Sequence, residues 1–174
     1  MKLMNSIHKY DIFVFNWLTN VRIHATLAKL GRYISKTADG PLYALCLIVV
    51  GGYGGYQSTL FLAIVLAFII ERPIYFILKN GFRRNRPETA LKNFTSIITP
   101  SDQFSFPSGH TSAAFLMATL IGYFFPPLTL PLFCWAVLVG FSRIVLGVHF
   151  STDILVGAVL GTSIAMFSLE LVTR

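Results

Sequence analysis

Residues 60–78 read LFLAIVLAFIIERPIYFIL, a nearly continuous apolar run that decides the fold class of this chain. Its length approaches the roughly 20 residues that a helix needs to cross a bilayer. Four further apolar runs lie at 41–56, 108–125, 128–148 and 154–172. Pro126-Pro127 separates the run 108–125 from the run 128–148. We therefore expect an all-α, multi-pass transmembrane helical bundle with about five spans.

Composition supports a membrane protein made of one domain. The 174 residues are 55% hydrophobic and only 12% charged, with a mean hydropathy of +0.68. A soluble domain of this size needs far more charged surface, so we interpret residues 1–174 as a single membrane domain. Lys and Arg outnumber Asp and Glu by 14 to 7, and the excess lies between the apolar runs. This pattern favours the lipid bilayer and a phosphorylated lipid as partners over nucleic acid, and it leaves the oligomeric state open.

Residues 11–36 alternate apolar and polar side chains and so differ from the five runs. An arginine at the centre of a spanning helix, such as Arg22 here, costs roughly 2.5–3.5 kcal/mol. We expect an amphipathic interfacial helix within an N-terminal segment 1–39, followed by a catalytic helical bundle at 40–172. The alternative is a first spanning helix with a polar inner face, which would make six spans. A cleavable signal peptide is not expected, because the start lacks a clean apolar core and a small-residue cleavage site.

Several residues inside the apolar runs are interpreted as structural. Glu71 is expected to pair with Arg72 or with a neighbouring helix, because ionisable groups in a membrane usually face the bundle interior and pair. Cys46 and Cys134 match no metal-binding spacing and are interpreted as small buried apolar residues without a disulfide. Glycine pairs that favour close helix contacts are Gly51 with Gly55, and Gly157 with Gly161.

Polar motifs stand at the ends of the apolar runs. They are Lys79 with Arg86-Pro87, Pro107-Ser108-Gly109-His110, and Ser142-Arg143 followed by His149 and Asp153. Because the chain crosses the membrane between them, the expected topology brings all three motifs to the same face. Cations, histidines and a carboxylate gathered in this way are suited to binding a phosphate and transferring it.

The cations alone could stabilise a phosphate ester. Arg86 and Arg143 can each donate to two oxygens, and Lys79 adds a point charge. The sequence has no carboxylate cluster able to hold Mg²⁺, so we expect no metal and no cofactor. Seven residues of straight helix would separate Lys79 from Arg86 by roughly 10.5 Å, so the chain should bend, as Gly81 permits. The other basic residues nearby are interpreted as a solvated cluster facing lipid headgroups: Arg83, Arg84 and Lys92.

Both histidines have a chemical and a structural interpretation. Ser108 can cap the third span and Gly109 permits close backbone approach, so that free N–H groups bind phosphate beside His110. A simple cap with an interfacial histidine explains this motif equally well. His149 and Asp153 have the i, i+4 spacing of one helix face. Asp153 can therefore accept a hydrogen bond from the Nδ1–H, which fixes the tautomer and leaves Nε2 free to attack phosphorus. The alternative is a capping aspartate beside an interfacial histidine.

Taken together, K-x6-R-P, P-S-G-H and S-R-x5-H-x3-D resemble the three-part signature of the type 2 phosphatidic acid phosphatase family. The resemblance implies a metal-independent lipid phosphatase with a helical-bundle fold. It implies His149 as the nucleophile that forms a phosphohistidine, Asp153 as its orienting group, and His110 as the proton donor that later activates water. The groups that would bind the phosphoryl group are Lys79, Arg86, Ser108, Gly109 and Arg143. Vanadium haloperoxidases share the signature, but a small membrane chain favours the phosphatase.

The sequence leaves the substrate and the orientation open. Residues 88–106 and grooves between spans should select the lipid. The candidates are a polyprenyl diphosphate such as undecaprenyl diphosphate, phosphatidylglycerol phosphate, phosphatidic acid and lipid A phosphate.

A lipid phosphotransferase and a non-enzymatic membrane protein are the alternative functions. Short loops favour a bacterial source, and hence the cytoplasmic membrane. The positive-inside rule would place the motif face in the cytoplasm, but substrate-binding cations inflate that count.

Overall fold

The computed structural model describes residues 2–174, with side-chain surroundings from residue 8 onward. All regular structure in this range is helical, which confirms the all-α fold class. The elements are α1 (Lys2–Thr19), α2 (His24–Lys36), α3 (Gly40–Gly54), α4 (Thr59–Phe82), α5 (Pro87–Ala90), α6 (Gly109–Phe124), the 3₁₀ turn η1 (Pro126–Leu128), α7 (Thr129–Val145) and α8 (Ser151–Thr173).

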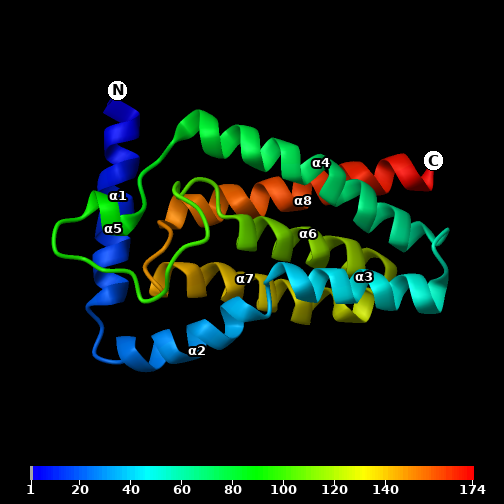
Figure 1. The fold of residues 1–174 in the computed structure, drawn as a ribbon, viewed down its shortest axis with the longest axis horizontal. Coiled ribbons are helices and arrows are strands. Elements are labelled where there is room, and N and C mark those ends of the chain that lie inside the picture. Colours follow the sequence, from blue (N-terminus) through cyan, green and yellow to red (C-terminus); the bar gives the residue numbers. More distant parts are fainter. Residues whose placement is uncertain (1) are drawn as a thin grey trace.

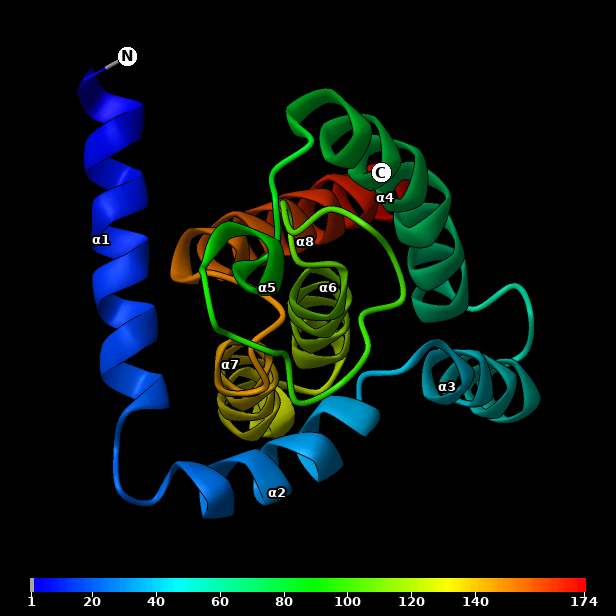
Figure 2. The ribbon, with the colours of Figure 1, turned by 60° about the vertical axis from the view of Figure 1, so that its left-hand side comes forward.

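The long helices run side by side, and α6 lies at their centre. Figure 1 shows α3, α4, α6, α7 and α8 along one direction, and Figure 2 looks toward the end of α6, with the others around it. α6 packs against α8, α7 and α4. Leu116, Ala118 and Leu120 on α6 are fully buried. A helix that is apolar on every side is expected in such a central position.

Helices occupy the positions of all five expected spans. Three helical segments are long and apolar enough to cross a membrane, at Thr59–Ala90, Pro126–Val145 and Ser151–Thr173. α2 and α3 meet this requirement only as a pair bent by 40°. α6 has 16 residues, fewer than the roughly 20 that a bilayer requires. The count of five spans therefore stays a prediction.

The N-terminal segment forms two helices, so the expectation of a single helix over 11–36 is wrong. α1 ends at Thr19, and α2 begins at His24. The buried positions of α2 are Ala28, Gly31 and Ser35, which lie on one helix face. A Cβ on Gly31 would lie 3.6 Å from the Cβ of Ser142, so this glycine lets α2 pack closely on α7. The residues of α2 that pack on protein are thus small, whereas its large apolar side chains Leu30 and Tyr33 are exposed. A position of α2 in the membrane interface stays a prediction.

Inside the bundle, Glu71 pairs with Arg72 as expected, and its other oxygen accepts a hydrogen bond of 2.6 Å from Ser112. Two smaller expectations are wrong. Gly55 lies beyond the end of α3 with φ +80, where it turns the chain instead of packing a helix face. Cys134 is exposed because α7 turns this position outward; both cysteines are free.

The crossing of α6 and α8 depends on two glycines. A Cβ on Gly157 would lie 2.7 Å from the Ser108 carbonyl oxygen, and one on Gly161 would overlap the Ser112 carbonyl. We expect Gly161→Ala to destabilise the protein by about 1–3 kcal/mol through overpacking. The measurement is thermal unfolding in detergent, with Gly52→Ala as the control because a Cβ there meets nothing within 4 Å. Equal melting temperatures for the two variants would contradict this packing.

Candidate active site

The three sequence motifs meet at one end of the bundle, on the left in Figure 1. Lys79 lies in the last turn of α4, and Arg86 immediately precedes α5. His110 lies in the first turn of α6, and Arg143 in the last turn of α7. His149 lies in the short loop before α8. The helices thus bring together residues that are remote in sequence.

The chain bends between Lys79 and Arg86, but not at Gly81. α4 continues to Phe82, and Arg83 then adopts the left-handed conformation, with φ 47 and ψ 38. The Arg83 N–H donates to the Lys79 carbonyl at 3.1 Å, closing the helix. Arg86 is extended, with φ −73 and ψ 160, as expected for a residue before proline. The expectation of a bend at Gly81 is wrong because the residue after the helix end makes the turn.

A loop carboxylate, Asp102, binds two of the cations. Lys79 Nζ donates to Asp102 Oδ2 at 2.7 Å, and Arg86 pairs with Oδ1. Tyr75 donates its hydroxyl to the same carboxylate at 2.9 Å. Burial raises the pKa of Asp102, but the hydrogen bonds and charges of Lys79 and Arg86 outweigh burial and hold that pKa below its ordinary value. Sequence analysis missed Asp102, although it is the acidic residue nearest before the Pro-Ser-Gly-His motif.

Arg143 is buried with an unused donor. Its NH1 donates to Ser35 Oγ at 2.5 Å, and its Nε has no partner among the described residues. A buried donor without a partner is unfavourable, and an anion beside Arg143 would satisfy it. Within the part of the chain that the structure describes, no group of three or more His, Cys, Asp or Glu side chains could hold a metal ion.

His149 lies against Asp153, and both side chains are buried. The distance from His149 Nδ1 to Asp153 Oδ2 is 3.6 Å, slightly beyond a hydrogen bond. Because α8 begins at Ser151, His149 lies outside the helix, and the i, i+4 helix geometry does not apply. Asp153 Oδ2 also accepts the Phe150 N–H at 2.8 Å. Asp153 is therefore both the capping residue and the neighbour of the histidine, so the two interpretations of this motif are not exclusive.

The His149 imidazole is expected to remain neutral well below neutral pH. Burial lowers its pKa to about 4, and Asp153 only partly opposes this shift. Histidine-selective ¹⁵N NMR in detergent should show no titration of His149 between pH 5 and 8, with His149→Gln assigning the signal. In the unfolded chain this histidine titrates near 6.5, so between pH 6.5 and 4 the unfolded state binds a proton that the folded state does not. The free energy of unfolding is therefore highest above pH 6.5 and decreases as the pH falls toward 4. A signal that titrates near 6.5 would contradict the burial.

His110 contacts a second carboxylate that sequence analysis missed. Its Nε2 lies 2.9 Å from Oδ1 of Asp39, the residue before α3. Ser108 stands at the N-cap of α6, but its side chain accepts a hydrogen bond of 2.9 Å from Thr111 and does not cap the helix. The expectation of a side-chain cap is wrong because Ser108 is buried against that neighbour.

Gly109 gives space to an aromatic ring. A Cβ at this position would lie 3.0 Å from the Tyr75 ring, whose hydroxyl reaches Lys79 and Asp102. The glycine therefore permits a close approach, here by the Tyr75 side chain. Substitution would displace Tyr75 and, through it, the contacts of Lys79.

Two cavities meet at His110, which lines both of them. The larger has a volume of about 510 Å³, and apolar residues of α3 and α4 such as Leu47, Ile64 and Phe68 form its walls. The other has a volume of about 450 Å³ and is lined by the cations Arg32, Lys36 and Arg143, among others. His110 thus lines both an apolar cavity and a cationic one.

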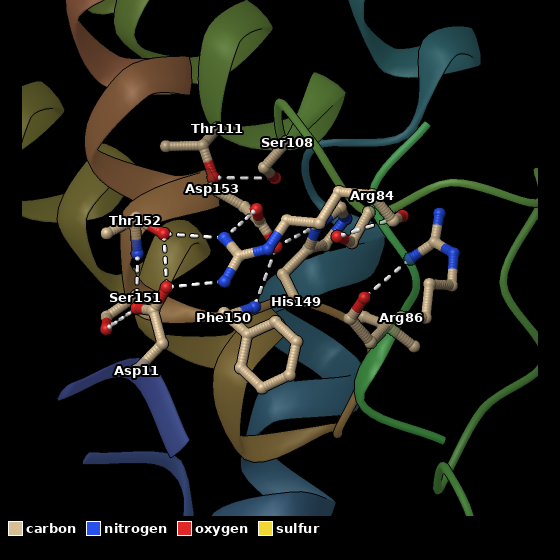
Figure 3. Close-up of polar contacts among 12 residues, drawn as sticks. Asp11, Arg84, Arg86, Ser108, Thr111, His149, Phe150, Ser151, Thr152 and Asp153 are labelled. Atoms are coloured by element: carbon tan, nitrogen blue, oxygen red, sulfur yellow. Dashed lines mark hydrogen bonds and ion pairs between the residues drawn. The ribbon is translucent and has the colours of Figure 1, made fainter. Parts of the chain in front are cut away.

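Arg84 is not part of a solvated cluster, which corrects the sequence interpretation. Its guanidinium donates to Asp153 Oδ1 at 2.8 Å and to Asp11 Oδ2 at 2.6 Å (Figure 3). It also lies over the Phe150 ring, 4.6 Å from the centroid. Arg83, by contrast, is exposed. Sequence patterns could not separate these neighbouring arginines, because the partners of Arg84 come from α1 and α8.

Comparison with known proteins gives one family. The family model of the PAP2 superfamily matches residues 58–174. A crystal structure of Aquifex aeolicus LpxE is similar, with a TM-score of 0.81 and 29% identity, covering 91% of this chain and 94% of that one. So is a crystal structure of a PAP2-type phosphatidylglycerolphosphate phosphatase from Bacillus subtilis, with a TM-score of 0.80 and 25% identity over 96% of this chain and 86% of that one.

A sequence relative points in the same direction. The phosphatidylglycerophosphatase B of Bacillus subtilis is 36% identical over 137 residues, which cover 71% of this chain and 64% of that protein. The match therefore spans slightly less than two thirds of the length of this relative. The helical architecture and the family are shared, while α1 lies outside the residues that the family model matches.

Proposed function

The chain belongs to the PAP2 superfamily, and we propose that it is a membrane lipid phosphatase that hydrolyses a phosphomonoester or diphosphate of a lipid. Candidate substrates are polyprenyl diphosphates such as undecaprenyl diphosphate, phosphatidylglycerol phosphate and phosphatidic acid. The names of the two Bacillus subtilis relatives make phosphatidylglycerol phosphate the first lipid to test. We further propose that 40–172 is the catalytic bundle of a single domain in a bacterial cytoplasmic membrane.

The phosphoryl group is bound by the cations at the end of the bundle. Lys79, Arg86 and Arg143 come from three different elements and can contact its oxygens together. At the N-terminus of α6, Gly109 adds a backbone N–H group. Ser108 contributes its hydroxyl, because its own N–H donates to the Asp153 carbonyl at 3.0 Å. The substrate phosphate displaces the Asp102 carboxylate, which occupies the same donors. The phosphate also accepts a hydrogen bond from Arg143 Nε, which has no partner among the described residues.

The reaction proceeds in two steps. Nε2 of neutral His149 attacks phosphorus, the bond from phosphorus to the lipid oxygen breaks, and His110 donates a proton to that oxygen. Asp153 holds the proton on Nδ1 of the nucleophile, because the 3.6 Å contact tightens when substrate is bound. His110 then takes a proton from water, which attacks the phosphohistidine and releases inorganic phosphate and His149. The cations stabilise the charge of both transition states, so no metal ion is required.

The observation that carries this proposal is that the half-buried His110 lines both the apolar cavity and the cavity that contains the cations Arg32, Lys36 and Arg143. The cavity of about 510 Å³ is lined by His110 and by apolar residues of α3 and α4. An apolar chain can lie along these residues while its phosphate reaches the cations. A soluble phosphate ester has no apolar chain to bury against these residues, so they would not strengthen its binding.

The test is phosphate release by the protein purified in detergent, with EDTA present, across lipid monophosphates and diphosphates. We expect release from at least one lipid, and the preferred lipid would name the substrate class. Release only after an acceptor lipid is added would identify a phosphotransferase instead. If neither condition yields a product, the protein is not an enzyme of this class.

The cavity itself can be tested by narrowing it. Ala44 lines the apolar cavity, and Ala44→Trp should raise KM for a long-chain lipid phosphate about tenfold, equivalent to about 1.4 kcal/mol of lost contact. Turnover of a short-chain, water-soluble phosphate should be unchanged. The exposed neighbour Leu45, which does not line this cavity, provides the control Leu45→Trp. Equal effects on the long and the short substrate would contradict a lipid-chain site here.

A further inference from the structure

Asp11 on α1 is fully buried, yet its carboxylate contacts the start of α8. Its Oδ1 accepts hydrogen bonds of 2.6 Å from Ser151 Oγ and 3.0 Å from the Thr152 N–H. Its Oδ2 accepts from Thr152 Oγ1 and, at 2.6 Å, from Arg84. Figure 3 shows these groups converging on one carboxylate. A buried carboxylate with this many donors fixes the backbone and side chains around it.

Arg84 connects this carboxylate to the proposed catalytic pair. One guanidinium nitrogen donates to Asp11 Oδ2, and the other donates to Asp153 Oδ1 at 2.8 Å. The side chain is 20% exposed and lies over the Phe150 ring. A planar fork held by two carboxylates and a ring has little freedom to rotate.

The result is a defined orientation for Asp153. Its Oδ1 is held by Arg84, and its Oδ2 is held by the Phe150 N–H and faces His149 Nδ1. The plane of the carboxylate is thereby set so that Oδ2 is directed at the imidazole. Without Arg84, the Asp153 carboxylate could rotate about its side-chain bonds. Oδ2 would then no longer be held at 3.6 Å from His149 Nδ1, from where a small movement completes a hydrogen bond.

We infer that Asp11 and Arg84 are positioning residues, which act on His149 through Asp153. The inference rests on the proposed function of the His149–Asp153 pair. It also makes α1 part of the active-site structure, although this helix lies outside the residues matched by the family model. Neither residue contacts the proposed phosphate site, so neither is catalytic.

The test is a double-mutant cycle between Arg84→Gln and Asp153→Asn. Arg84→Gln should lower kcat about 10²-fold through misplacement of the nucleophile, with KM changed less than about twofold. In the Asp153→Asn background, Arg84→Gln should have no further effect on kcat, because the group through which it acts is gone. Arg84→Lys should restore part of kcat, since it keeps the charge. Asp11→Asn should show the same dependence on Asp153.

A purely structural role gives a different result. In that case Arg84→Gln would lower the melting temperature, and its effect on kcat would multiply that of Asp153→Asn. The control Arg83→Gln changes the neighbouring exposed arginine and should leave kcat unaffected. Independent effects of Arg84 and Asp153 would overturn the inference.

A readout without turnover separates this inference from the proposed function. The ¹⁵N signals of the His149 imidazole report its tautomer and its contact with Asp153 in the free protein. Arg84→Gln and Asp11→Asn should both move these signals, whereas Arg83→Gln should not. If the wild type releases no phosphate but the signals move, the proposed function fails and the positioning stands. If the signals stay unchanged in folded variants, the positioning fails, whatever the activity.

Discussion

His149→Ala is expected to lower phosphate release by at least about 10⁴-fold, while the protein still folds. The alanine removes the atom that we propose forms the bond to phosphorus, and none of the histidines elsewhere in the described chain lies against Asp153. Folding should survive because the lost contacts are those of one loop residue before α8. The measurement is phosphate release in detergent at saturating lipid, beside thermal unfolding of the same preparations.

The control for this variant is His24→Ala. It removes a histidine whose Nε2 lies 3.0 Å from the Val145 carbonyl oxygen and which is not one of the proposed site residues. Its turnover should stay close to that of the wild type. The wild-type enzyme should also retain turnover in EDTA and be inhibited by vanadate, which resembles the pentacoordinate transition state. Turnover by folded His149→Ala, or a strict requirement for a metal ion, would refute the phosphohistidine mechanism.

Arg143→Lys is expected to lower kcat/KM about 10²-fold and to weaken inhibition by vanadate in parallel. The lysine keeps the charge but loses the guanidinium fork that we propose contacts two phosphate oxygens, and removal of one such donor typically reduces the rate by about 10²–10³-fold. The effect should be large because Arg143 is buried and its Nε lacks a protein partner within the described residues. Steady-state kinetics with the preferred lipid provide the measurement.

The matched control is Arg174→Lys, the same chemical change at an exposed arginine that pairs with Glu170 on α8. No change in kcat/KM is expected there. If Arg143→Lys reduced folding instead of turnover, its melting temperature would fall, which thermal unfolding would reveal. A folded Arg143→Lys enzyme with normal kcat/KM would exclude Arg143 from phosphate binding.

The sequence was informative wherever local chain properties decide the structure. Apolar runs bounded by glycine, proline and polar residues predicted the positions of five helices, because burial of apolar side chains and helix-breaking residues act over a few turns. The same reasoning failed between residues 19 and 24, where the N-terminal helix breaks. Alternating polarity indicated one amphipathic helix, but it could not show that α2 turns to pack against α7.

The meeting of the motif residues at one end of the bundle was also predictable, since each motif stands at the end of an apolar run. Their partners were not. Asp11, Asp39 and Asp102 are acidic residues in unremarkable local sequence, yet each binds a motif residue or Arg84. Asp102 lies 23 residues from Lys79 along the chain, and Asp11 lies 73 residues from Arg84. No periodicity or spacing connects positions so far apart.

By itself, the sequence determined that this chain is helical, apolar and suited to a membrane, and that cations and histidines stand at the ends of its helices. Tertiary structure alone decided which carboxylates pair with Lys79, Arg84 and Arg86, and which of the neighbours Arg83 and Arg84 is exposed. The physical reason is that helix formation and burial depend on neighbours along the chain, whereas an ion pair depends on distance in space. That distance is set only when α1, the loop before α6 and the start of α8 pack together.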